Sequence, residues 1–354
     1  MGYILLRTFS AFFLFAAFFP LVKLDYWWVR IFDYPRLQKL VITLVLIICW
    51  ILTLDIESNL EPYLWIFALA ITSIYLITKV WPFTPLGKKM IGTVPYSVEA
   101  GIHILVGNVY QYNTNYGKLV ALVKSVDPDM VFFVETDKAW ENGLAEIENS
   151  YPTRIKLPMD NTYGLLLYTR MEIIRQKVNY LIDDQIPSLE IDVKLRNGEV
   201  ITIYAIHPTP PVPGENDKST ERDAEILLVG KKSKENDNPS LVIGDLNDVA
   251  WSYTTELFLK NSEMADPRRG RGLFNTFHAK VPLFRWPLDH IFLSMHFGLA
   301  SLKVQRGIDS DHFPISIKAV LTSTDDTDTI QANGDEKKEA HEKISRGLND
   351  DEDK

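Results

Sequence analysis

The hydrophobic and polar positions divide the chain into three parts with different patterns. The first part, residues 1–96, contains three uncharged apolar runs at residues 8–22, 40–54 and 62–78. Each run is close to the length of roughly 17–25 residues that a helix needs to cross a bilayer. Aromatic residues border the runs, as they do at membrane–water interfaces: Tyr26, Trp27, Trp28, Tyr34, Tyr63, Trp65 and Trp81. The pattern predicts about three transmembrane helices.

Other interpretations of these runs remain open. A single run of this length is also compatible with a buried core helix or an interfacial segment, so a spanning pair plus one interfacial helix is the main alternative. A cleaved signal peptide is disfavoured, because the first run lacks a clear small-x-small cleavage site and two further apolar runs follow it.

The charges between the runs predict an orientation. The second connection is acidic, with Asp55, Glu57 and Glu61 and no basic residue. The first connection and the stretch after the third run are basic, with Lys23, Arg30, Arg36, Lys39, Lys79, Lys88 and Lys89. Three spans place both basic stretches on the same side of the membrane as everything after residue 80. The positive-inside rule makes that side cytoplasmic.

The second part, residues 97–320, alternates short apolar strands with amphipathic helices. Strand patterns lie at residues 103–109, 130–134, 164–168, 241–243, 290–293 and 313–320. Residues 189–195 and 200–206 flank Asn197-Gly198, which is a strong hairpin signal. Helix patterns lie at residues 119–126 and from about 219 past 228. Hairpins mixed with helical crossovers predict an α/β domain with mixed sheets covered by helices.

The last part, residues 321–354, is acidic and has almost no large apolar side chains. Such a segment buries too little apolar surface to offset its ordering entropy. The composition therefore predicts an acidic disordered tail after the two preceding units.

Composition excludes several classes of protein. The chain has 354 residues, a formal net charge of −9 and a single cysteine, Cys49. One cysteine rules out a disulfide scaffold and a thiolate metal cluster. The acidic balance argues against a protein held to nucleic acid by bulk positive charge.

Polar residues stand where the strands of the second part begin or end. Asn108 and Glu135 end the first two strands, and His207 follows residues 201–206. Gly244-Asp245-Leu246-Asn247 follows the buried run 241–243, Asp289-His290 opens the next strand and Ser310-Asp311-His312 the last. Each of these residues alone has an ordinary explanation as a turn or loop residue. Together they predict a polar rim at one edge of the domain.

The ordered set of Asn108, Glu135, His207, Gly-Asp-x-Asn, Asp289-His290 and Ser-Asp-His resembles the endonuclease/exonuclease/phosphatase superfamily, the DNase I-like fold. The resemblance covers about residues 97–320. His-Pro-Thr-Pro-Pro at 207–211 and Trp251-Ser252 look like a bacterial, membrane-anchored branch of it. The family implies a four-layer α/β sandwich of two mixed β-sheets covered by helices, here preceded by an α-helical transmembrane region.

The resemblance also implies residue roles. Glu135 would be the main metal ligand, with Asn108 nearby and Asp311 completing or supporting the shell of Mg²⁺ or Mn²⁺. Asp245 would position or deprotonate the attacking water, and Asn247 would hold the phosphate. His312, oriented by Asp289, would contact a phosphoryl oxygen. His207 would be a second histidine facing the phosphate or the leaving group. Oxygen ligands without cysteine suit these hard cations.

A basic loop between the motifs is a further candidate for substrate binding. Arg268, Arg269 and Arg271 fit either a solvated loop or a loop that grips phosphate, since arginine forms bidentate contacts with phosphate. Trp251 is a candidate for stacking on a base or covering a lipid, although buried packing is the simpler role.

These observations predict a membrane-anchored, metal-dependent hydrolase of phosphodiester bonds, acting by in-line attack of water. A nuclease-type activity on nucleic acid is the first hypothesis. A phospholipid or phosphoinositide-type phosphodiesterase or phosphatase is the alternative, and a non-catalytic membrane scaffold is the third. The lipid bilayer and the phosphodiester substrate are the expected partners, and the sequence points to no protein partner.

Overall fold

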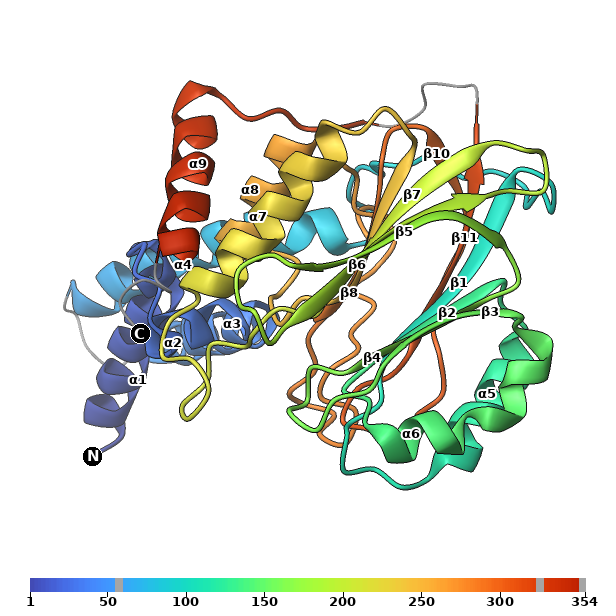
Figure 1. Ribbon diagram of the computed structural model, residues 1–354. Helices are drawn as coiled ribbons and strands as arrows, with labels where there is room; N and C mark the ends of the chain where they lie inside the picture. Colours follow the sequence, from blue (N-terminus) through green and yellow to red (C-terminus); the bar gives the residue numbers. More distant parts are fainter. Residues whose placement is uncertain (55–59, 323–327, 350–354) are drawn as a thin grey trace.

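The computed structural model describes residues 1–54, 60–322 and 328–349. The acidic residues Asp55 and Glu57, and the tail residues 323–327 and 350–354, lie outside the described residues. Two β-sheets pack face to face in the centre, with helices on both outer faces (Figure 1). The predicted four-layer α/β sandwich with mixed sheets is confirmed.

The first sheet has six strands in the order β10-β11-β1-β2-β4-β3. Strands β1 and β2 are parallel, and the other neighbours are antiparallel. Their bounds are β1 Gly101–Asn108, β2 Met130–Val134, β3 Thr153–Leu157, β4 Leu165–Thr169, β10 Phe297–Val304 and β11 Ile315–Leu321.

The second sheet has five strands in the order β5-β6-β7-β8-β9. Strands β7 and β8 are parallel, and the predicted hairpin around Asn197-Gly198 joins β6 to β7. The bounds are β5 Glu172–Tyr180, β6 Pro187–Lys194, β7 Val200–Ala205, β8 Ser240–Asp245 and β9 Asp289–Leu293. The apolar inner faces of both sheets form one continuous buried core. Strands β3, β5 and β10 escaped the sequence analysis, because β5 is largely exposed and the other two are only partly buried.

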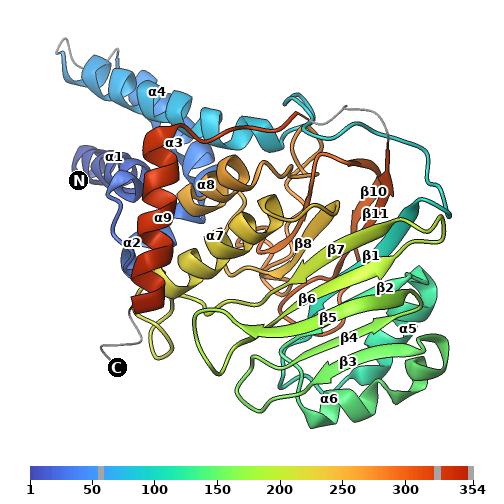
Figure 2. The same cartoon turned by 45° about the horizontal axis from the view of Figure 1, so that its top comes forward.

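Helices cover the outer faces of this sandwich. Helices α5 (Tyr116–Val126) and α6 (Lys138–Gly143) pack on the first sheet, and α7 (Thr220–Lys234) and α8 (Tyr253–Ser262) pack on the second (Figure 2). Short 3₁₀ segments complete the connections: η1 Phe19–Leu21, η2 Ile31–Asp33, η3 Trp81–Phe83 and η4 Ala145–Ser150.

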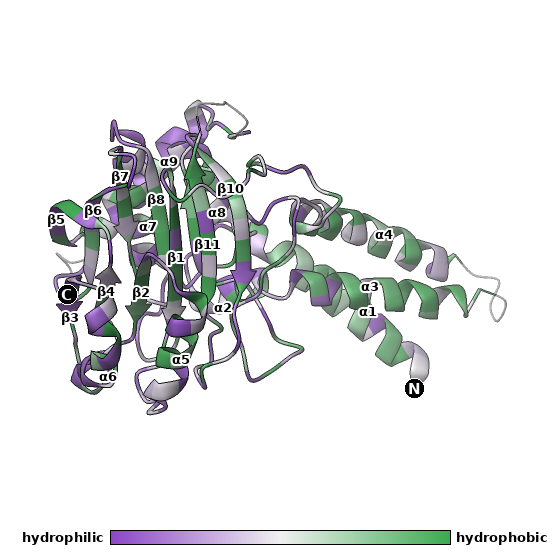
Figure 3. Ribbon diagram, turned by 90° about the vertical axis from the view of Figure 1, so that its right-hand side faces the viewer, coloured by the Kyte–Doolittle hydropathy of each residue, from purple (hydrophilic) through white to green (hydrophobic). Residues whose placement is uncertain are grey.

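The N-terminal part forms a helical bundle that projects from the sandwich (Figure 3). It consists of α1 (Gly2–Phe18), α3 (Arg36–Ile51) and α4 (Glu61–Val80), with the short α2 (Trp27–Arg30) at its base. Two stretches, Gly2–Leu21 and Glu61–Phe83, are long and apolar enough to cross a membrane. Residues 27–33 and 36–51 make a third candidate only if this pair, bent by 68°, is one span.

The C-terminal part differs from the sequence prediction. Residues Gly334–Asn349, expected to be disordered, form helix α9, which packs against α7. The prediction failed here because it counted only apolar surface. Helix α9 is held by buried charge as well as by apolar contacts of Ala340 and Ile344. The buried Lys343 ammonium donates to Asp223 at 2.9 Å and to Asp25 at 3.0 Å.

Candidate active site

The carboxyl ends of the two parallel strand pairs bring the predicted residues to one edge of the sandwich. Asn108 ends β1 in the first sheet, and Asp245 ends β8 in the second. The Asn108 amide Nδ2 donates to Asp245 Oδ2 at 3.0 Å and to Glu135 Oε1, just after β2, at 2.6 Å. Side chains from both sheets therefore meet at Asn108, and the predicted polar rim is present.

His312 lies between two buried carboxylates. Its Nδ1 is 2.8 Å from Asp289 Oδ2, and its Nε2 is 3.4 Å from Asp245 Oδ2. Burial disfavours the imidazolium, but the carboxylates of Asp245 and Asp289 outweigh it and raise the pKa of His312 to about 10. The ring also packs on Phe277 at a centroid distance of 4.9 Å. His312 is therefore a buried cation at neutral pH, positioned by Asp289.

Glu135 and Asp311 bring further acidic charge to this edge. Burial raises the pKa of Glu135 to about 7, against the hydrogen bond from Asn108. The cation of His312 opposes this increase in the pKa, and the neighbouring carboxylates of Asp245 and Asp311 contribute to it. The Ser310 hydroxyl donates to the Asn108 carbonyl at 2.9 Å, which fixes the Ser-Asp-His turn against the end of β1. Acidic charge at this edge thus exceeds the single cation of His312.

The backbone around Asp245 requires particular residues. A Cβ on Gly244, at φ +144°, would lie 1.9 Å from the Ile206 carbonyl oxygen, so only glycine fits before the aspartate. Asn247 and Glu135 adopt φ values of +52° and +58° in the left-handed region. Non-glycine residues in this region are often found at functional sites. The Asn247 amide nitrogen Nδ2 donates to the Pro208 carbonyl at 2.9 Å, which ties the Gly-Asp-x-Asn turn to the loop after His207.

His207 is buried beside the same turn. Burial lowers the pKa of His207 to about 4, so the imidazole is neutral at pH 7. Among the described residues, its Nδ1 has no hydrogen-bond partner. The side chain is therefore available as a neutral donor or acceptor rather than as a second cation.

The acidic side chains at this edge differ in their suitability for a metal. The ligand atoms of Asp245, Asp289 and His312 all lie within 4.8 Å of one another. Both ring nitrogens of His312 already face carboxylates. The group of Asp245, Asp289 and His312 is therefore better suited to holding or transferring a proton than to binding a metal ion. Glu135 and Asp311 offer the oxygen ligands that Mg²⁺ prefers. Asn108 is placed beside them, although its Oδ1 accepts from the Tyr110 backbone amide at 2.9 Å.

Two residues that the sequence analysis did not connect with the site hold the Asn247 backbone. The carbonyl oxygen of Asn247 accepts from Tyr34 Oη at 3.1 Å and from Arg222 Nη1 at 2.7 Å. Tyr34 belongs to the N-terminal part, where the sequence pattern predicts only an aromatic residue at the membrane–water interface. The sequence does contain a signal for Arg222. Helix α7 begins with four polar residues that are all buried, Thr220-Glu221-Arg222-Asp223.

The basic loop has a different role from the one expected. Arg268 is buried and pairs with Asp266 at 2.8 Å, while its Nη2 also donates to His290 Nδ1 at 2.7 Å. Arg269 pairs with Glu256 at 2.5 Å, and Arg271 donates to the Ile91 carbonyl. The expectation of a loop that grips phosphate is therefore not met.

Trp251 is likewise part of the packing. It is buried, its Nε1 donates to the Asp33 carbonyl at 2.9 Å, and its ring packs edge-on against Phe83. The side chain joins the N-terminal part to the sandwich instead of facing a substrate.

Comparison with known proteins agrees with this arrangement. The profile of the Endonuclease/Exonuclease/phosphatase family matches residues 108–312, from Asn108 through His312. No curated protein matches the chain.

Solved structures of this family share the fold. The endonuclease/exonuclease/phosphatase from Bacteroides vulgatus superposes with a TM-score of 0.51 at 18% identity, covering 63% of this chain and 99% of its own. The family protein from Bacteroides thetaiotaomicron gives 0.50 at 17%, with the same coverage. D. rerio TDP2 complexed with a single-strand DNA product gives 0.50 at 19%, covering 62% and 99%. The chain belongs to the endonuclease/exonuclease/phosphatase family.

Proposed function

We propose that this chain is a membrane-tethered, divalent-metal-dependent hydrolase of phosphoester bonds. The observation that carries the proposal is the convergence of Glu135, Asp245, Asp311 and protonated His312 at one edge of the sandwich. A phosphodiester repels an incoming nucleophile, so its hydrolysis requires positive charge around the phosphoryl oxygens and an aligned water. This edge supplies groups for both.

Glu135 and Asp311 would hold Mg²⁺ or Mn²⁺, with Asn108 beside them. The excess of buried carboxylate and the raised pKa of Glu135 fit a site that is completed by a divalent cation. Family members generally use such ions, which supply charge neutralisation at the phosphoryl oxygens.

The roles proposed for Asp245 and His312 rest on their contacts, and those proposed for Asn247 and His207 rest on the resemblance to the family. Asp245 lies opposite His312 Nε2, where its carboxylate can orient a water and accept a proton. His312 would donate from Nε2 to a phosphoryl oxygen while Asp289 fixes the ring through Nδ1. Asn247 would contact the phosphate, and neutral His207 would face the phosphate or the leaving oxygen.

The membrane tether rests on the N-terminal bundle. Its interior is packed, with Trp50 Nε1 donating to Ser10 Oγ at 2.9 Å. Its helices consist mostly of hydrophobic residues (Figure 3). Large apolar side chains are exposed on all three: Ile4, Phe9, Phe12, Phe15, Val41, Val45, Ile48, Leu64, Phe67, Ile71 and Ile74. Large apolar side chains exposed in this number, on every helix of the bundle, are typical of contact with lipid. We assign residues 1–96 to the membrane region and 97–320 to the catalytic domain, on the cytoplasmic side.

A nuclease activity is the second candidate. D. rerio TDP2, which shares the fold, is complexed with a single-strand DNA product. Two observations count against this candidate. The net charge of the chain is negative, and the arginines of the basic loop make contacts within the protein: Arg268, Arg269 and Arg271. The complete set of acidic and histidine side chains argues against a non-catalytic scaffold.

A soluble chromogenic diester tests the proposal without a choice of natural substrate. The full chain in nanodiscs should release 4-nitrophenol from methyl 4-nitrophenyl phosphate with Mg²⁺ or Mn²⁺ and not with EDTA. Glu135→Gln should lose this activity. Glu172→Gln, the same change on an exposed part of β5, should keep it. Equal rates in EDTA and Mg²⁺ would refute metal dependence.

A further inference from the structure

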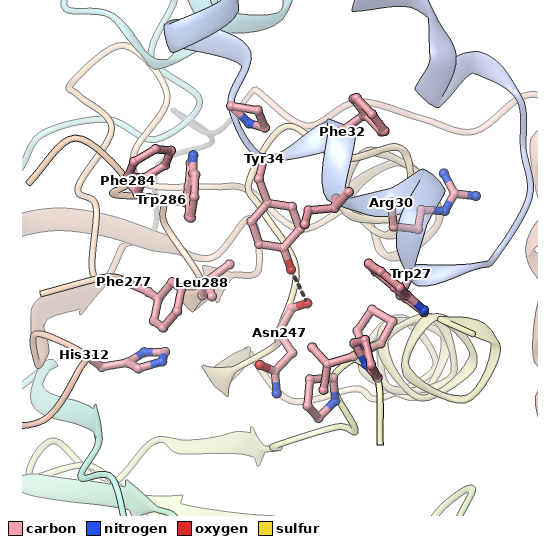
Figure 4. A pocket seen from close by; sticks show the side chains of 16 residues that line it. Trp27, Arg30, Phe32, Tyr34, Asn247, Phe277, Phe284, Trp286, Leu288 and His312 are labelled. Carbon is pink, nitrogen blue, oxygen red and sulfur yellow. Dashed lines mark hydrogen bonds between the residues drawn. The ribbon is translucent and has the colours of Figure 1, made fainter. Parts of the chain in front are cut away.

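A cavity of about 620 Å³ begins at the active site and extends towards the base of the helical bundle. His312 and Asn247 lie at one end (Figure 4). Its other walls come from three segments that are far apart in the sequence: residues 27–35, 210–213 and 277–288. The volume is within the range of about 300–1,000 Å³ that is usual for small-molecule sites.

The walls of this cavity are apolar. Trp27, Phe32, Phe277, Phe284 and Trp286 supply aromatic faces (Figure 4), and prolines and aliphatic residues supply most of the rest: Ile31, Pro35, Pro210, Pro211, Val212, Pro213 and Leu288. His312 and Asn247 supply polar groups at the catalytic end, and Arg30 on the opposite side is paired with Asp25 and Asp33. The cavity is therefore suited to a ligand with a phosphate at one end and hydrocarbon at the other.

The only Lys or Arg side chain that lines the cavity among the described residues is already neutralised. Arg30 pairs with Asp25 at 3.4 Å and with Asp33 at 3.7 Å. Nucleic acid is held mainly by cationic contacts to successive phosphates. A cavity with one phosphate position and apolar walls does not meet that requirement.

The rim of the cavity continues the apolar surface of the bundle. Ile31 and Phe284 are each 53% exposed, and Leu283 is 79% exposed. Gln38, near the start of α3, donates from Nε2 to the Leu283 carbonyl at 2.9 Å, so the loop with Leu283 and Phe284 lies against the base of the bundle. The opening is thus next to the surface that we assign to the bilayer.

We infer that the substrate is a membrane lipid with a phosphoester in its head group, and that its hydrocarbon part occupies this cavity while the phosphate lies at His312 and Asn247. The inference rests on the proposed hydrolase function and names its substrate class. In the reaction, the oxygen of water bonds to phosphorus and the P–O bond to the leaving alcohol breaks. The proton from water ends on the leaving oxygen, which gives a phosphomonoester and an alcohol.

Two diesters with the same scissile bond test the inference: methyl and dodecyl 4-nitrophenyl phosphate, the latter below its micelle-forming concentration. For the full chain in nanodiscs with Mg²⁺, kcat/KM should be at least about tenfold higher for the dodecyl ester. Ile31→Ser and Phe284→Ser should lower this ratio severalfold. Two control variants should leave the ratio unchanged. Ile174→Ser is the matched change at a side chain that is 51% exposed on β5, and Leu86→Ser changes an exposed apolar residue outside the cavity lining.

The outcomes separate the inference from the proposed function. Two results would overturn the lipid inference and leave the hydrolase function intact. One is metal-dependent cleavage of both esters with equal kcat/KM. The other is a dodecyl-to-methyl ratio of kcat/KM that is unchanged in both Ile31→Ser and Phe284→Ser. Cleavage of single-stranded DNA with a higher kcat/KM than the dodecyl ester would overturn it in favour of a nuclease. Cleavage of neither ester would overturn the hydrolase function and the inference with it.

Discussion

Burial sets the protonation states on which the proposed chemistry depends. Asp245, Asp289 and His312 are removed from water, so the charge on each is controlled by its neighbours and not by solvent. Burial raises the pKa of Asp245, and the cation of His312 opposes that effect. A single substitution here changes the charge of the whole group.

Asp245→Asn should reduce kcat by a factor of about 10²–10⁴, the usual contribution of a general base. The change removes the group that orients the water and also the charge that faces His312 Nε2. Thermal stability should stay close to that of the wild type, because the amide has the same shape and the Asp289 carboxylate still faces the His312 ring at 2.8 Å. Rate assays and thermal melts check both parts; full activity would remove Asp245 from the site.

A buried carboxyl outside the site predicts a pH-dependent stability. Burial raises the pKa of Glu225 on α7 to about 8 from its ordinary value of 4.5, and Asp183 adds to the effect. The folded protein therefore holds this proton more tightly than the unfolded chain does. The resulting stabilisation is complete below pH 4.5 and is lost as the pH rises towards 8.

Glu225→Gln should remove this loss. The melting temperature of the variant should match that of the wild type near pH 5 and exceed it at pH 8, by an amount that corresponds to a few kcal/mol. Thermal melts across this range measure the difference directly. A difference between the two proteins that does not vary with pH would show that Glu225 is not buried as described.

At the scale of elements, one buried ionic network joins the base of the bundle to the active-site turn. Lys343 of α9 contacts Asp25 before α2 and Asp223 of α7. Arg222, next in sequence to Asp223, pairs with it and donates to the Asn247 carbonyl. The C-terminal helix is thus linked to the Gly-Asp-x-Asn turn through three side chains, Lys343, Asp223 and Arg222.

Lys343→Met should destabilise the protein by about 3–5 kcal/mol, because it leaves two buried carboxylates without their shared partner. Lys338→Met, a change on the exposed face of the same helix, should have little effect. Comparison of their thermal melts checks the role of α9. Equal melting temperatures for Lys343→Met and Lys338→Met would mean that α9 is not docked on α7.

The failures of sequence analysis occur at this same scale. Strand periodicity identified β1, β2 and β8, and the polar residues at their ends predicted the site. Helix α9 was missed because its stability comes from partners more than 100 residues away, Asp25 and Asp223. Arg268 differs from both expectations for its loop: it is buried against Asp266, two residues before it in the sequence, and against His290, and no pattern in the sequence indicated that burial.

At the scale of the whole molecule, the bundle and the sandwich share one cavity, to which the N-terminal part contributes Trp27, Phe32 and Tyr34. No pattern in the sequence connects those residues with His312, since the contact depends on how the bundle sits on the sandwich. The N-terminal part of the chain therefore forms a wall of the cavity, in addition to the role of membrane tether that we propose for it.

The assigned orientation predicts the side on which the sandwich is accessible. Cys49, the single native cysteine, lies within α3, so a cysteine at exposed Val98 reports the location of the sandwich. On intact cells, Val98→Cys should resist a membrane-impermeant thiol reagent and should react after lysis. Reaction on intact cells would reverse the orientation.

The most direct test of the central claim is the initial rate of phosphodiester hydrolysis by the purified full chain before and after metal removal. Release of 4-nitrophenol from dodecyl 4-nitrophenyl phosphate should stop in EDTA and return when Mg²⁺ or Mn²⁺ is added in excess. Glu135→Gln should show no comparable recovery. Hydrolysis that continues in EDTA, or no hydrolysis with either metal, would contradict the account.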